Sequence, residues 1–465
     1  MTAENQEYKV IIIGTGQAGN PLAKALASAG WKTAVIESDH VGGTCINYGC
    51  TPTKTMVASA RVAYLARHAG EFGVEIPSYS TNLKTVIARK NKIVNSFRQG
   101  GQQGLENTHN LDLIFGFARF TGTHQLEIEK NSGEKVLLNA EFIVINTGAK
   151  PLIPDIPGLK EIDYLDSSTI MDVKEIPQHL VVLGGGYIGL EFGQMFRRFG
   201  SQVTIIQRGS QLLSREDEDV AESVATILEG EGIKILLNSQ VTAVNRISND
   251  QLDISLTMDG KPCQIKGSHL LVAVGRIPSS AELQLDQAGI SRNSLGFIKV
   301  NDSLETNVPG VYAIGDVKGG PAFTHISYDD YRILRDFFLQ GTRRTIQERL
   351  VPYTVFIDPQ LGRVGLTEKE AKALGVNYRL AKLPMTYVAR ALESEETRGF
   401  MKALVDEKTG RILGCAILGI EGGEIMSVIQ VAMMGNLHYT SIREGVFAHP
   451  TLSESLNNLF MAMDR

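Results

Sequence analysis

Cysteine is scarce in this 465-residue chain, which has four cysteines and a single tryptophan. Four cysteines are too few to cross-link a chain of this length, so a disulfide-rich extracellular scaffold is excluded. No apolar run approaches the ~20 residues that span a bilayer, and the N-terminus lacks the apolar core of a signal peptide. Hydrophobic residues at 43% and charged residues at 21% exclude a disordered or collagen-like chain. We therefore expect a folded cytoplasmic protein without a membrane partner.

Positive charge is also limited, because 46 basic against 51 acidic residues give a formal net charge of −5. This balance offers no long-range attraction for phosphate backbones, which argues against a nucleic-acid partner. Glycine, in contrast, is abundant: 47 of the 465 residues, or about 10% against roughly 7% in ordinary proteins. The excess indicates many tight turns or close backbone approaches.

One glycine motif occurs twice, as GTGQAG at residues 14–19 and as GGGYIG at residues 184–189. Each copy lies between an apolar strand and a helical stretch, and the next strand ends 23 residues after the first glycine, at Glu37 and at Gln207. The first glycine of such a motif allows a tight turn, the second lets the backbone approach a pyrophosphate, and the third packs helix on strand. A single copy could be a structural loop, but two copies in the same setting predict two dinucleotide-binding units. The glycines concerned are Gly14, Gly16, Gly19, Gly184, Gly186 and Gly189.

Two of the cysteines lie in the stretch GGTCINYGCTPTK, residues 42–54. Pro52 suits the first turn of a helix, so we expect Cys50 beside the positive end of that helix, where the pKa of a thiol is lowered. Lys54 lies one turn further on the same face and adds a second positive charge. Half a zinc site and a structural disulfide are the alternatives, but zinc needs about four ligands and no second Cys/His cluster is present. The favoured interpretation is a redox-active dithiol of Cys45 and Cys50, with no metal site.

The cysteine stretch resembles the redox signature of the class I flavoprotein disulfide reductases, the pyridine nucleotide-disulfide oxidoreductases. This family includes dihydrolipoyl dehydrogenase, glutathione reductase and mercuric reductase. The resemblance covers essentially the whole chain, through TGAKP (147–151), VAVGRIP (272–278), YAIGD (312–316) and HPTLSE (449–454), in the family's order.

The resemblance implies an α/β fold with two Rossmann-like dinucleotide-binding domains and a C-terminal α/β dimerisation domain. The implied segments are 1–150 for FAD, 151–276 for NAD(P), 277–345 for a central domain that completes the FAD site, and 346–465 for dimerisation.

The resemblance also implies the two cofactors and the residues that hold them. FAD would lie on the first unit, with Glu37 at the adenosine end, Ala118 near the adenine, Lys54 near the flavin N5 and Asp316 on the ribityl chain. NAD(P)H would bind the second unit, where Tyr187 would cover the empty nicotinamide pocket. The other cofactor-binding residues implied by the family's motifs are Gly43, Thr44, Thr147, Gly148, Glu191, Gln207, Arg208, Gly275, Gly315, Phe323, Thr324 and His325.

The two cysteines would have different roles in such an enzyme. In the family the second cysteine, here Cys50, reacts with the flavin and forms the charge-transfer thiolate. The first, here Cys45, exchanges with the substrate. Glu191 would pair with Lys54.

The C-terminal motif supplies the last catalytic residues. His449 and Glu454 resemble the family's acid/base pair, which the partner subunit donates across a homodimer. A helix capping box at Thr451 and Glu454 is the alternative, and both can hold together. Histidine suits proton transfer near neutral pH, because a carboxylate partner sets its tautomer and basicity.

The choice of nicotinamide nucleotide depends on the end of the second strand. An acid there would bond a 2′-hydroxyl and repel a 2′-phosphate, and Gln207 removes that repulsion. Arg208 and Arg215 could bind the phosphate, although both could equally be solvated surface charges. Gly189 argues the other way, because members that prefer NADPH often have alanine there. We expect NADPH, with NADH possible.

The electron acceptor is the least determined feature. No cysteine follows Cys415, so the C-terminal cysteine pair of mercuric reductases proper is absent, and dihydrolipoyl dehydrogenases usually have an acid in place of Gln207. The stretches CINYGCTPTKT, FTHISYDDYRI and HPTLSESLNNLF are most similar to the mercuric-reductase-like group that contains a copper(II) reductase responsive to reactive chlorine. We expect electrons to pass from NAD(P)H through FAD and the cysteine pair to a disulfide, a metal ion such as Hg(II) or Cu(II), or another small oxidant. The alternatives are a dihydrolipoyl dehydrogenase and a non-enzymatic flavin-binding redox sensor, and we interpret Cys263 and Cys415 as bystanders.

Overall fold

The computed structural model describes residues 5–248, 251–347 and 349–464, which form two compact units. The first unit contains the chain up to Thr55, Ala88–Leu152 and Gly275–Arg349. The second contains Met56–Ile87, Ile153–Val274 and the chain from Leu350 onward. Helices α3 (Cys50–His68) and α4 (Leu83–Glu106) contribute residues to both units. Among the described residues, no helix has the length and apolar character needed to cross a bilayer.

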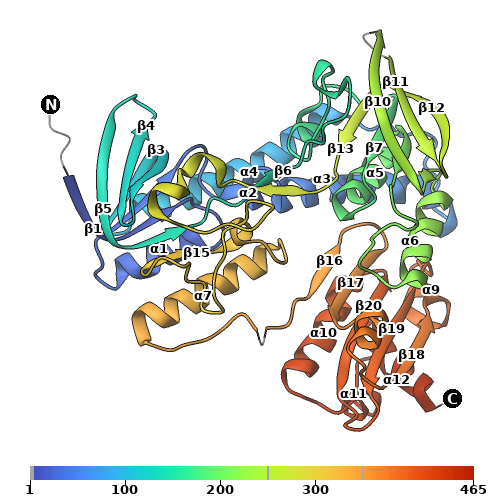
Figure 1. Ribbon diagram of the computed structural model, residues 1–465. Coiled ribbons are helices and arrows are strands. Elements are labelled where there is room, and N and C mark those ends of the chain that lie inside the picture. The colour runs from blue at the N-terminus through green and yellow to red at the C-terminus, as the bar shows by residue number, and fades with distance from the viewer. Residues whose placement is uncertain (1–4, 249–250, 348, 465) are drawn as a thin grey trace. The chain divides into compact units, whose positions relative to one another are not determined.

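The first unit is built on a sheet in which β3, β2, β1, β5 and β15 are parallel neighbours in that order. Their bounds are Leu111–Gly122, Thr33–Glu37, Asn5–Ile13, Lys135–Ile145 and Val311–Ala313. β4 (Gln125–Lys130) pairs antiparallel with β3 and β5, so these three strands continue as an antiparallel ribbon (Figure 1). A short antiparallel pair, β6 (Ala149–Pro151) with β14 (Arg276–Pro278), completes the unit.

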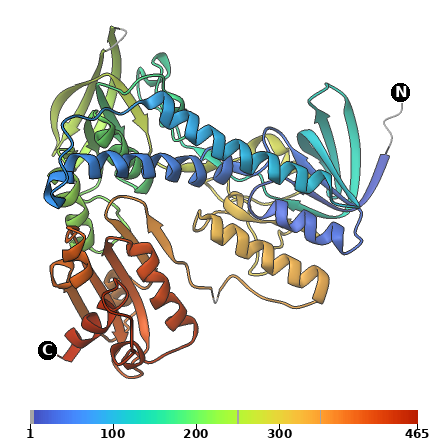
Figure 2. The ribbon, with the colours of Figure 1, turned by 180° about the vertical axis from the view of Figure 1, so that it is seen from behind.

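Helices cover the parallel part of this sheet. α1 (Gly19–Ser28) and α7 (Thr324–Gln340) pack side by side, as Figure 2 shows. Ile11 and Ile12 of β1 point to opposite faces, yet both are fully buried. A continuous apolar run is expected of a parallel strand that is covered on both faces. The single tryptophan, Trp31, stacks on Phe142 with ring centroids 5.7 Å apart.

The second unit contains another parallel sheet, with the strand order β13, β7, β8, β9. Their bounds are His269–Val272, His179–Leu183, Gln202–Ile206 and Lys234–Leu236, and the helices are α5 (Tyr187–Phe199) and α6 (Glu218–Gly230). An antiparallel sheet of β10 (Ser239–Ser248), β11 (Gln251–Met258) and β12 (Lys261–Gly267) accompanies it. The two parallel sheets, each with one glycine motif after its first strand, confirm the predicted pair of Rossmann-like domains.

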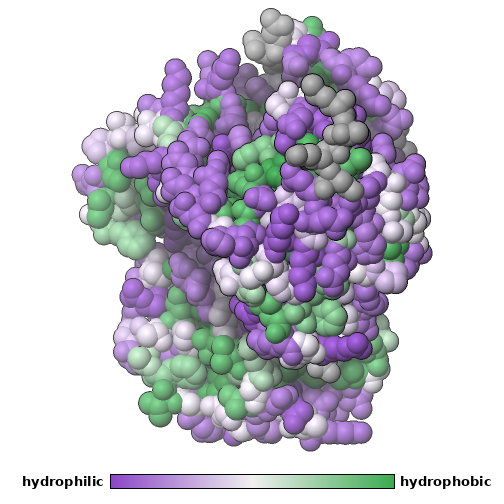
Figure 3. Space-filling view, turned by 90° about the vertical axis from the view of Figure 1, so that its left-hand side faces the viewer, coloured by the Kyte–Doolittle hydropathy of each residue, from purple (hydrophilic) through white to green (hydrophobic). Residues whose placement is uncertain are grey.

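The C-terminal domain, residues 350–464, is a five-stranded antiparallel sheet with the order β16, β17, β20, β19, β18. The strand bounds are Tyr353–Val355, Gln360–Gly365, Ile412–Gly419, Phe400–Asp406 and Tyr378–Pro384. The helices are α8 (Glu368–Ala373), α9 (Ala389–Glu393), α10 (Gly422–Met434), α11 (Thr440–Arg443) and α12 (Ser455–Met461). Met401, Ile417 and Phe460 lie in its fully buried core. On the face drawn in Figure 3, hydrophobic residues are interspersed among hydrophilic ones.

Candidate functional site

The glycine turn of the first unit leaves no room for side chains. Gly14 has a left-handed φ of 105°, and a Cβ there would lie 2.4 Å from the backbone oxygen of Asn146. A Cβ on Gly19 would lie 2.3 Å from the oxygen of Gly14, and one on Gly16 would lie 2.9 Å from Oδ1 of Asn146. Each of the three glycines is therefore required by a close approach to Asn146 or to the turn itself.

Asn146, which the sequence did not single out, ties this turn together. Its Oδ1 accepts the backbone N–H of Gly19 at 2.9 Å, and its Nδ2 donates to the oxygen of Ile314 at 3.0 Å. These partners are 127 and 168 residues away along the chain. The only local signal was that Asn146 directly precedes the TGAKP motif.

Glu37, at the end of β2, is buried and holds the same turn. Its Oε2 accepts the backbone N–H of Thr15 at 3.0 Å and also the Thr15 hydroxyl. Its Oε1 accepts the N–H of Asp39 at 2.9 Å, and the Thr15 hydroxyl accepts the N–H of Gly42 at 3.1 Å. The carboxylate thus links the glycine turn to the segment that enters the cysteine stretch, and it retains lone pairs for ribose hydroxyls.

The glycine turn of the second unit repeats this geometry. Gly184 has a φ of 115°, and a Cβ there would lie 2.4 Å from the oxygen of Ala273. A Cβ on Gly189 would lie 2.1 Å from the oxygen of Gly184. Oε1 of Gln207 accepts the backbone N–H of Gly185 at 3.0 Å. Each turn therefore leads into a helix whose N-cap residue provides no side-chain cap, a setting of the kind that binds pyrophosphate.

Other residues of the second unit surround this turn. Gly186 is the N-cap of α5, and Tyr187 is the first residue of that helix. Glu191 is buried on α5, and its Oε1 accepts the backbone N–H of Phe356 at 2.8 Å. Lys54 belongs to the first unit, so its pairing with Glu191 stays a prediction. Arg208 is exposed beyond the strand end.

Unsatisfied polar atoms mark a ligand site in the first unit. Thr147 Oγ1 and Arg276 Nε are buried without a hydrogen-bond partner among the described residues. Arg276 also donates through Nη2 to the backbone oxygen of Ala149, two residues after Thr147. Burial raises the pKa of Asp316, although Arg276 and Lys318 act in the opposite direction. A desolvated carboxyl beside orphaned donors fits a polar group such as the sugar and phosphate part of FAD.

Asp330 holds the segment that contains Asp316 through a hydrogen bond to its backbone. The sequence did not predict this role. Asp330 is fully buried, and its Oδ2 accepts the backbone N–H of Gly315 at 2.8 Å. Lys318 lies 3.3 Å from Asp330 and Arg349 lies 2.7 Å from it, so the buried charge is paired. Gly315 itself adopts a left-handed φ of 73°.

Further predicted cofactor residues also have definite places in the first unit. Gly43 and Thr44 lie in α2 (Gly43–Asn47), and Ala118 is buried on β3. Gly148 and Gly275 have φ values of 71° and 141° at the two ends of the β6–β14 pair. Phe323 is the N-cap of α7, which opens with Thr324 and His325, and the rings of Phe323 and His325 stack with centroids 5.4 Å apart.

The two cysteines flank the start of α3, as the sequence predicted. Cys45 lies on α2 and is partly buried, whereas Cys50 is the first residue of α3 and is exposed. Cys50 Sγ lies 3.4 Å from Thr324 Oγ1. A hydrogen bond to the Cys50 sulfur, followed by burial, raises the pKa of Cys45 far above its usual range, while Thr324 and Lys54 oppose this rise. Cys50, the first residue of α3, lies at the positive end of that helix, a position that favours a thiolate.

Asn47, between the two cysteines, fixes the turn that precedes Cys45. Its Nδ2 donates to the backbone oxygens of His40, Val41 and Gly43 at 3.3, 3.1 and 3.0 Å. Its Oδ1 accepts from Nε of Arg98 at 2.9 Å. One buried amide thus satisfies three carbonyl groups of the turn before Cys45, which was not evident from the motif.

His449 and Glu454 form a pair in the C-terminal domain. Nδ1 of His449 lies 2.9 and 3.0 Å from the two carboxylate oxygens of Glu454. The capping box is only half formed, since Thr451 Oγ1 accepts the N–H of Glu454 at 3.2 Å but the carboxylate turns to His449. The histidine side chain is 68% exposed, so its Nε2 edge is available for proton transfer to a group outside the domain.

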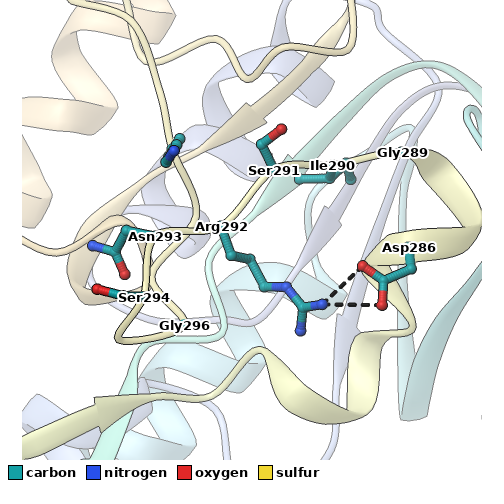
Figure 4. Close-up of a pocket in the computed structure, with 9 residues that line it drawn as sticks. Asp286, Gly289, Ile290, Ser291, Arg292, Asn293, Ser294 and Gly296 are labelled. Carbon is teal, nitrogen blue, oxygen red and sulfur yellow. Dashed lines mark hydrogen bonds and ion pairs between the residues drawn. The ribbon is translucent and has the colours of Figure 1, made fainter.

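A pocket of about 670 Å³ lies elsewhere in the first unit, between residues 286 and 299 (Figure 4). Arg292 reaches across it and contacts both oxygens of Asp286 at 2.8 and 3.0 Å. Its lining contains none of the predicted redox or cofactor residues, and its one guanidinium is already paired. Among the described residues, no group of three or more His, Cys, Asp or Glu side chains could hold a resident metal ion.

Comparison with known proteins places this geometry in context. Residues 8–330 match the family model of the pyridine nucleotide-disulphide oxidoreductases, and residues 351–460 match the dimerisation domain of that family. The chain is 41% identical to the probable pyridine nucleotide-disulfide oxidoreductase RclA of Escherichia coli, over 98% of this chain and 99% of that protein. It is 33% identical to a mercuric reductase of Lysinibacillus sphaericus, over 98% and 83% of the two chains. The solved Cu(II) complex of the HOCl-induced flavoprotein disulfide reductase RclA from Escherichia coli is similar with a TM-score of 0.89 and 40% identity, covering 98% and 99% of the two chains.

Proposed function

Because the chain belongs to the pyridine nucleotide-disulphide oxidoreductases, a family of FAD-binding enzymes that use NAD(P)H, we propose that it reduces Cu(II) or a similar thiol-binding metal ion. Electrons would pass from NADPH to the pair formed by Cys45 and Cys50. The observation that carries the proposal is the asymmetric dithiol, in which Cys45 is partly buried on α2 and Cys50 is exposed at the start of α3. A relative of similar length has a solved Cu(II) complex, which supports the choice of metal.

The proposed reaction balances in electrons and protons. FAD, when bound, supplies two-electron transfer between the nicotinamide and the cysteines. A hydride from one NADPH and one further proton convert the Cys45–Cys50 disulfide into two thiols. Re-formation of the disulfide releases two protons and returns two electrons, which reduce two Cu(II) ions to Cu(I) or open one disulfide substrate.

Each cysteine would have its own part in this cycle. Cys50, at the positive end of α3, would face the flavin as a thiolate, and Cys45 would contact the acceptor. The His449–Glu454 pair would accept and return the proton of Cys45. Because the C-terminal domain is the family's dimerisation domain, we place this pair on the partner subunit of a homodimer. The low cysteine content fits a reducing cytoplasm, where a dithiol of this kind stays active.

The nucleotide site favours NADPH in this proposal. Gln207 carries no charge that would repel a 2′-phosphate, and Arg208 and Arg215 are exposed near the strand end, where they could contact that phosphate. In the first unit, Glu37 would hold the adenosine end of FAD. Thr147, Arg276 and Asp316 would lie near the sugar and phosphate part of FAD.

The test is anaerobic reduction of the purified holoenzyme with NADPH or NADH, followed by oxidation with Cu(II), Hg(II), glutathione disulfide, lipoamide or a quinone. We expect Cys45→Ser to lose acceptor reduction but to keep the long-wavelength thiolate-to-flavin absorption band, and Cys50→Ser to lose both. Cys263→Ser is the matched control and should change neither. Rapid NAD⁺ reduction by dihydrolipoamide would favour a dihydrolipoyl dehydrogenase. Unaltered rates in Cys45→Ser would instead favour a redox sensor.

A further inference from the structure

Lys402, on β19 of the C-terminal domain, is a buried lysine with three carboxylate partners. Its side chain is 1% exposed, and its Nζ lies 3.0 Å from Asp217, 2.9 Å from Asp219 and 2.6 Å from Glu368. Burial acts against its charge, yet the hydrogen bonds that Lys402 donates to these carboxylates raise its pKa. All three ammonium protons have partners, so the charge is fully compensated. Two of the three carboxylates belong to the nucleotide-binding part of the unit.

Asp217 is attached to the C-terminal domain by more than this ion pair. It stands at the N-cap of α6, but its side chain does not cap that helix. Its two carboxylate oxygens accept the backbone N–H groups of Glu368 and Lys369, both at 3.1 Å, at the start of α8. The end of the segment 207–217 is therefore held by residues of the C-terminal domain.

Lys369 makes a second, exposed attachment to the same segment. Its Nζ donates to Oε1 of Gln211 at 3.0 Å and to the backbone oxygen of Glu216 at 2.8 Å. Gln211 in turn donates to the oxygen of Glu216 at 3.1 Å, which closes the segment on itself. The C-terminal domain thus contacts the segment at residues 211, 216 and 217.

Hydrogen bonds within the segment 207–217 connect these attachment points to the glycine turn. The backbone N–H of Glu216 donates to the oxygen of Leu213 at 2.8 Å, and the N–H of Leu213 donates to the oxygen of Gly185 at 2.9 Å. Gly185 then donates to Gln207 at 3.0 Å, at the other end of the segment. Gln207, Arg208 and Arg215 therefore lie on a loop that is fixed to the turn at one end and to Lys402 at the other.

We propose that Lys402 is a positioning residue for the nicotinamide nucleotide, because it holds the segment 207–217 in register with the glycine turn. The inference rests on the proposed function in one respect, namely that the second unit binds NAD(P)H. The new element is that Lys402, a residue of the dimerisation domain that does not contact the 184–189 turn itself, controls the affinity for NAD(P)H.

The test compares three lysine variants of the holoenzyme. We expect Lys402→Met to raise KM for NADPH and Kd for NADP⁺ about tenfold, with kcat at saturating NADPH within about twofold of wild type. Lys369→Met should shift both in the same direction by a smaller factor. Lys382→Met is the matched control, because Lys382 is an exposed lysine that lies 2.9 Å from Asp219 and does not contact the segment 207–217. A purely structural role would lower the thermal midpoint and FAD content of Lys402→Met without this split between KM and kcat.

An unchanged Kd for NADP⁺ in folded Lys402→Met would overturn the inference, as would an equal shift in Lys382→Met. If Lys402→Met does not fold, Lys369→Met tests the inference instead. The side chain of Lys369 is exposed, so this variant should fold, and the inference requires its Kd for NADP⁺ to rise. Titration with NADP⁺ followed by flavin absorbance needs no electron acceptor. A wild-type enzyme that binds NADP⁺ but reduces no acceptor would refute the proposed function and leave this inference testable.

Discussion

Gln207 accepts the backbone N–H of Gly185 at 3.0 Å, and Glu37 accepts the backbone N–H of Thr15 at the same distance in the first unit. In both units the acceptor lies 22 residues after its donor. The residue at the strand end therefore holds its own glycine turn. Glutamine keeps the bond to the turn and removes the negative charge that would repel a 2′-phosphate.

This relationship predicts that Gln207→Glu will convert the nucleotide preference. A carboxylate oxygen can replace the amide oxygen in the bond to Gly185, so the turn should stay intact. Repulsion of the 2′-phosphate should raise KM for NADPH about tenfold, with KM for NADH within about twofold. Steady-state kinetics with both nucleotides measure the change. Gln240→Glu, which adds the same charge at an exposed position on β10, is the control. An unchanged NADPH to NADH ratio of kcat/KM would mean that position 207 does not face the 2′ position.

We expect Thr147→Val to affect the stability of the FAD-free protein and the affinity for FAD in opposite directions. The buried hydroxyl of Thr147 has no partner among the described residues, so Thr147→Val should leave the stability of FAD-free protein unchanged or raise it slightly. If the hydroxyl bonds to FAD, the same change should raise Kd for FAD about tenfold, or by about 1.4 kcal/mol. Thermal unfolding of the stripped protein and FAD titration give the two values. Thr121→Val, at an exposed site on β3, should change neither. Equal FAD affinity in Thr147→Val and wild type would contradict the assignment.

The sequence predicted features that depend on local spacing. The glycine motifs at 14–19 and 184–189 are recognised by their spacing between a strand and a helix, and Cys50 at a helix start follows from Pro52. The missed residues act over long separations: Asn146 bonds Gly19 and Ile314, and Lys402 bonds Asp217 across 185 residues. An isolated asparagine or lysine carries no sign of such a partner, because the fold alone brings the two together.

A closed ring of six charged side chains in the second unit predicts both a mutational cost and a pH dependence. Arg198 lies 2.7 Å from Glu231 and 2.5 Å from Asp358, and the ring continues through Arg398, Glu396 and Arg61. Arg198 is 2% exposed, so Arg198→Met removes the shared partner of Glu231 and Asp358, whose side chains are only 9% and 15% exposed. We expect a loss of about 3–5 kcal/mol in the free energy of unfolding, measured by urea denaturation. Arg119→Met breaks the surface pair with Glu129 and should cost less than about 1 kcal/mol.

The same ring determines how stability responds to acid. Burial acts against ionisation, but Arg198 holds the pKa of Asp358 and of Glu231 below the usual range. A lowered pKa in the folded state adds stability above the unfolded values of about 4, and this stability is lost as the pH falls below them. Wild-type stability should therefore fall steeply below about pH 4, and Arg198→Met should show a shallower fall. Parallel stability curves for the two proteins between about pH 3 and 6 would contradict this account.

His449 predicts a defect confined to one half of the catalytic cycle. Its Nδ1 is held by Glu454 at 2.9 Å, so the exposed Nε2 edge is the part that can take a proton. His449→Asn should leave reduction of the enzyme by NADPH within about twofold of wild type, because that half-reaction does not involve the pair. Reoxidation by a disulfide acceptor should slow by about 10²–10⁴, the usual contribution of a general acid/base. Glu454→Gln should give a smaller loss in the same step, since the histidine keeps its ring but loses the carboxylate that orients it. Stopped-flow absorbance separates the two half-reactions, and His438→Asn, an exposed histidine bonded to Thr440, is the control. Equal slowing of both half-reactions in His449→Asn would show that the residue supports the fold of the domain rather than proton transfer.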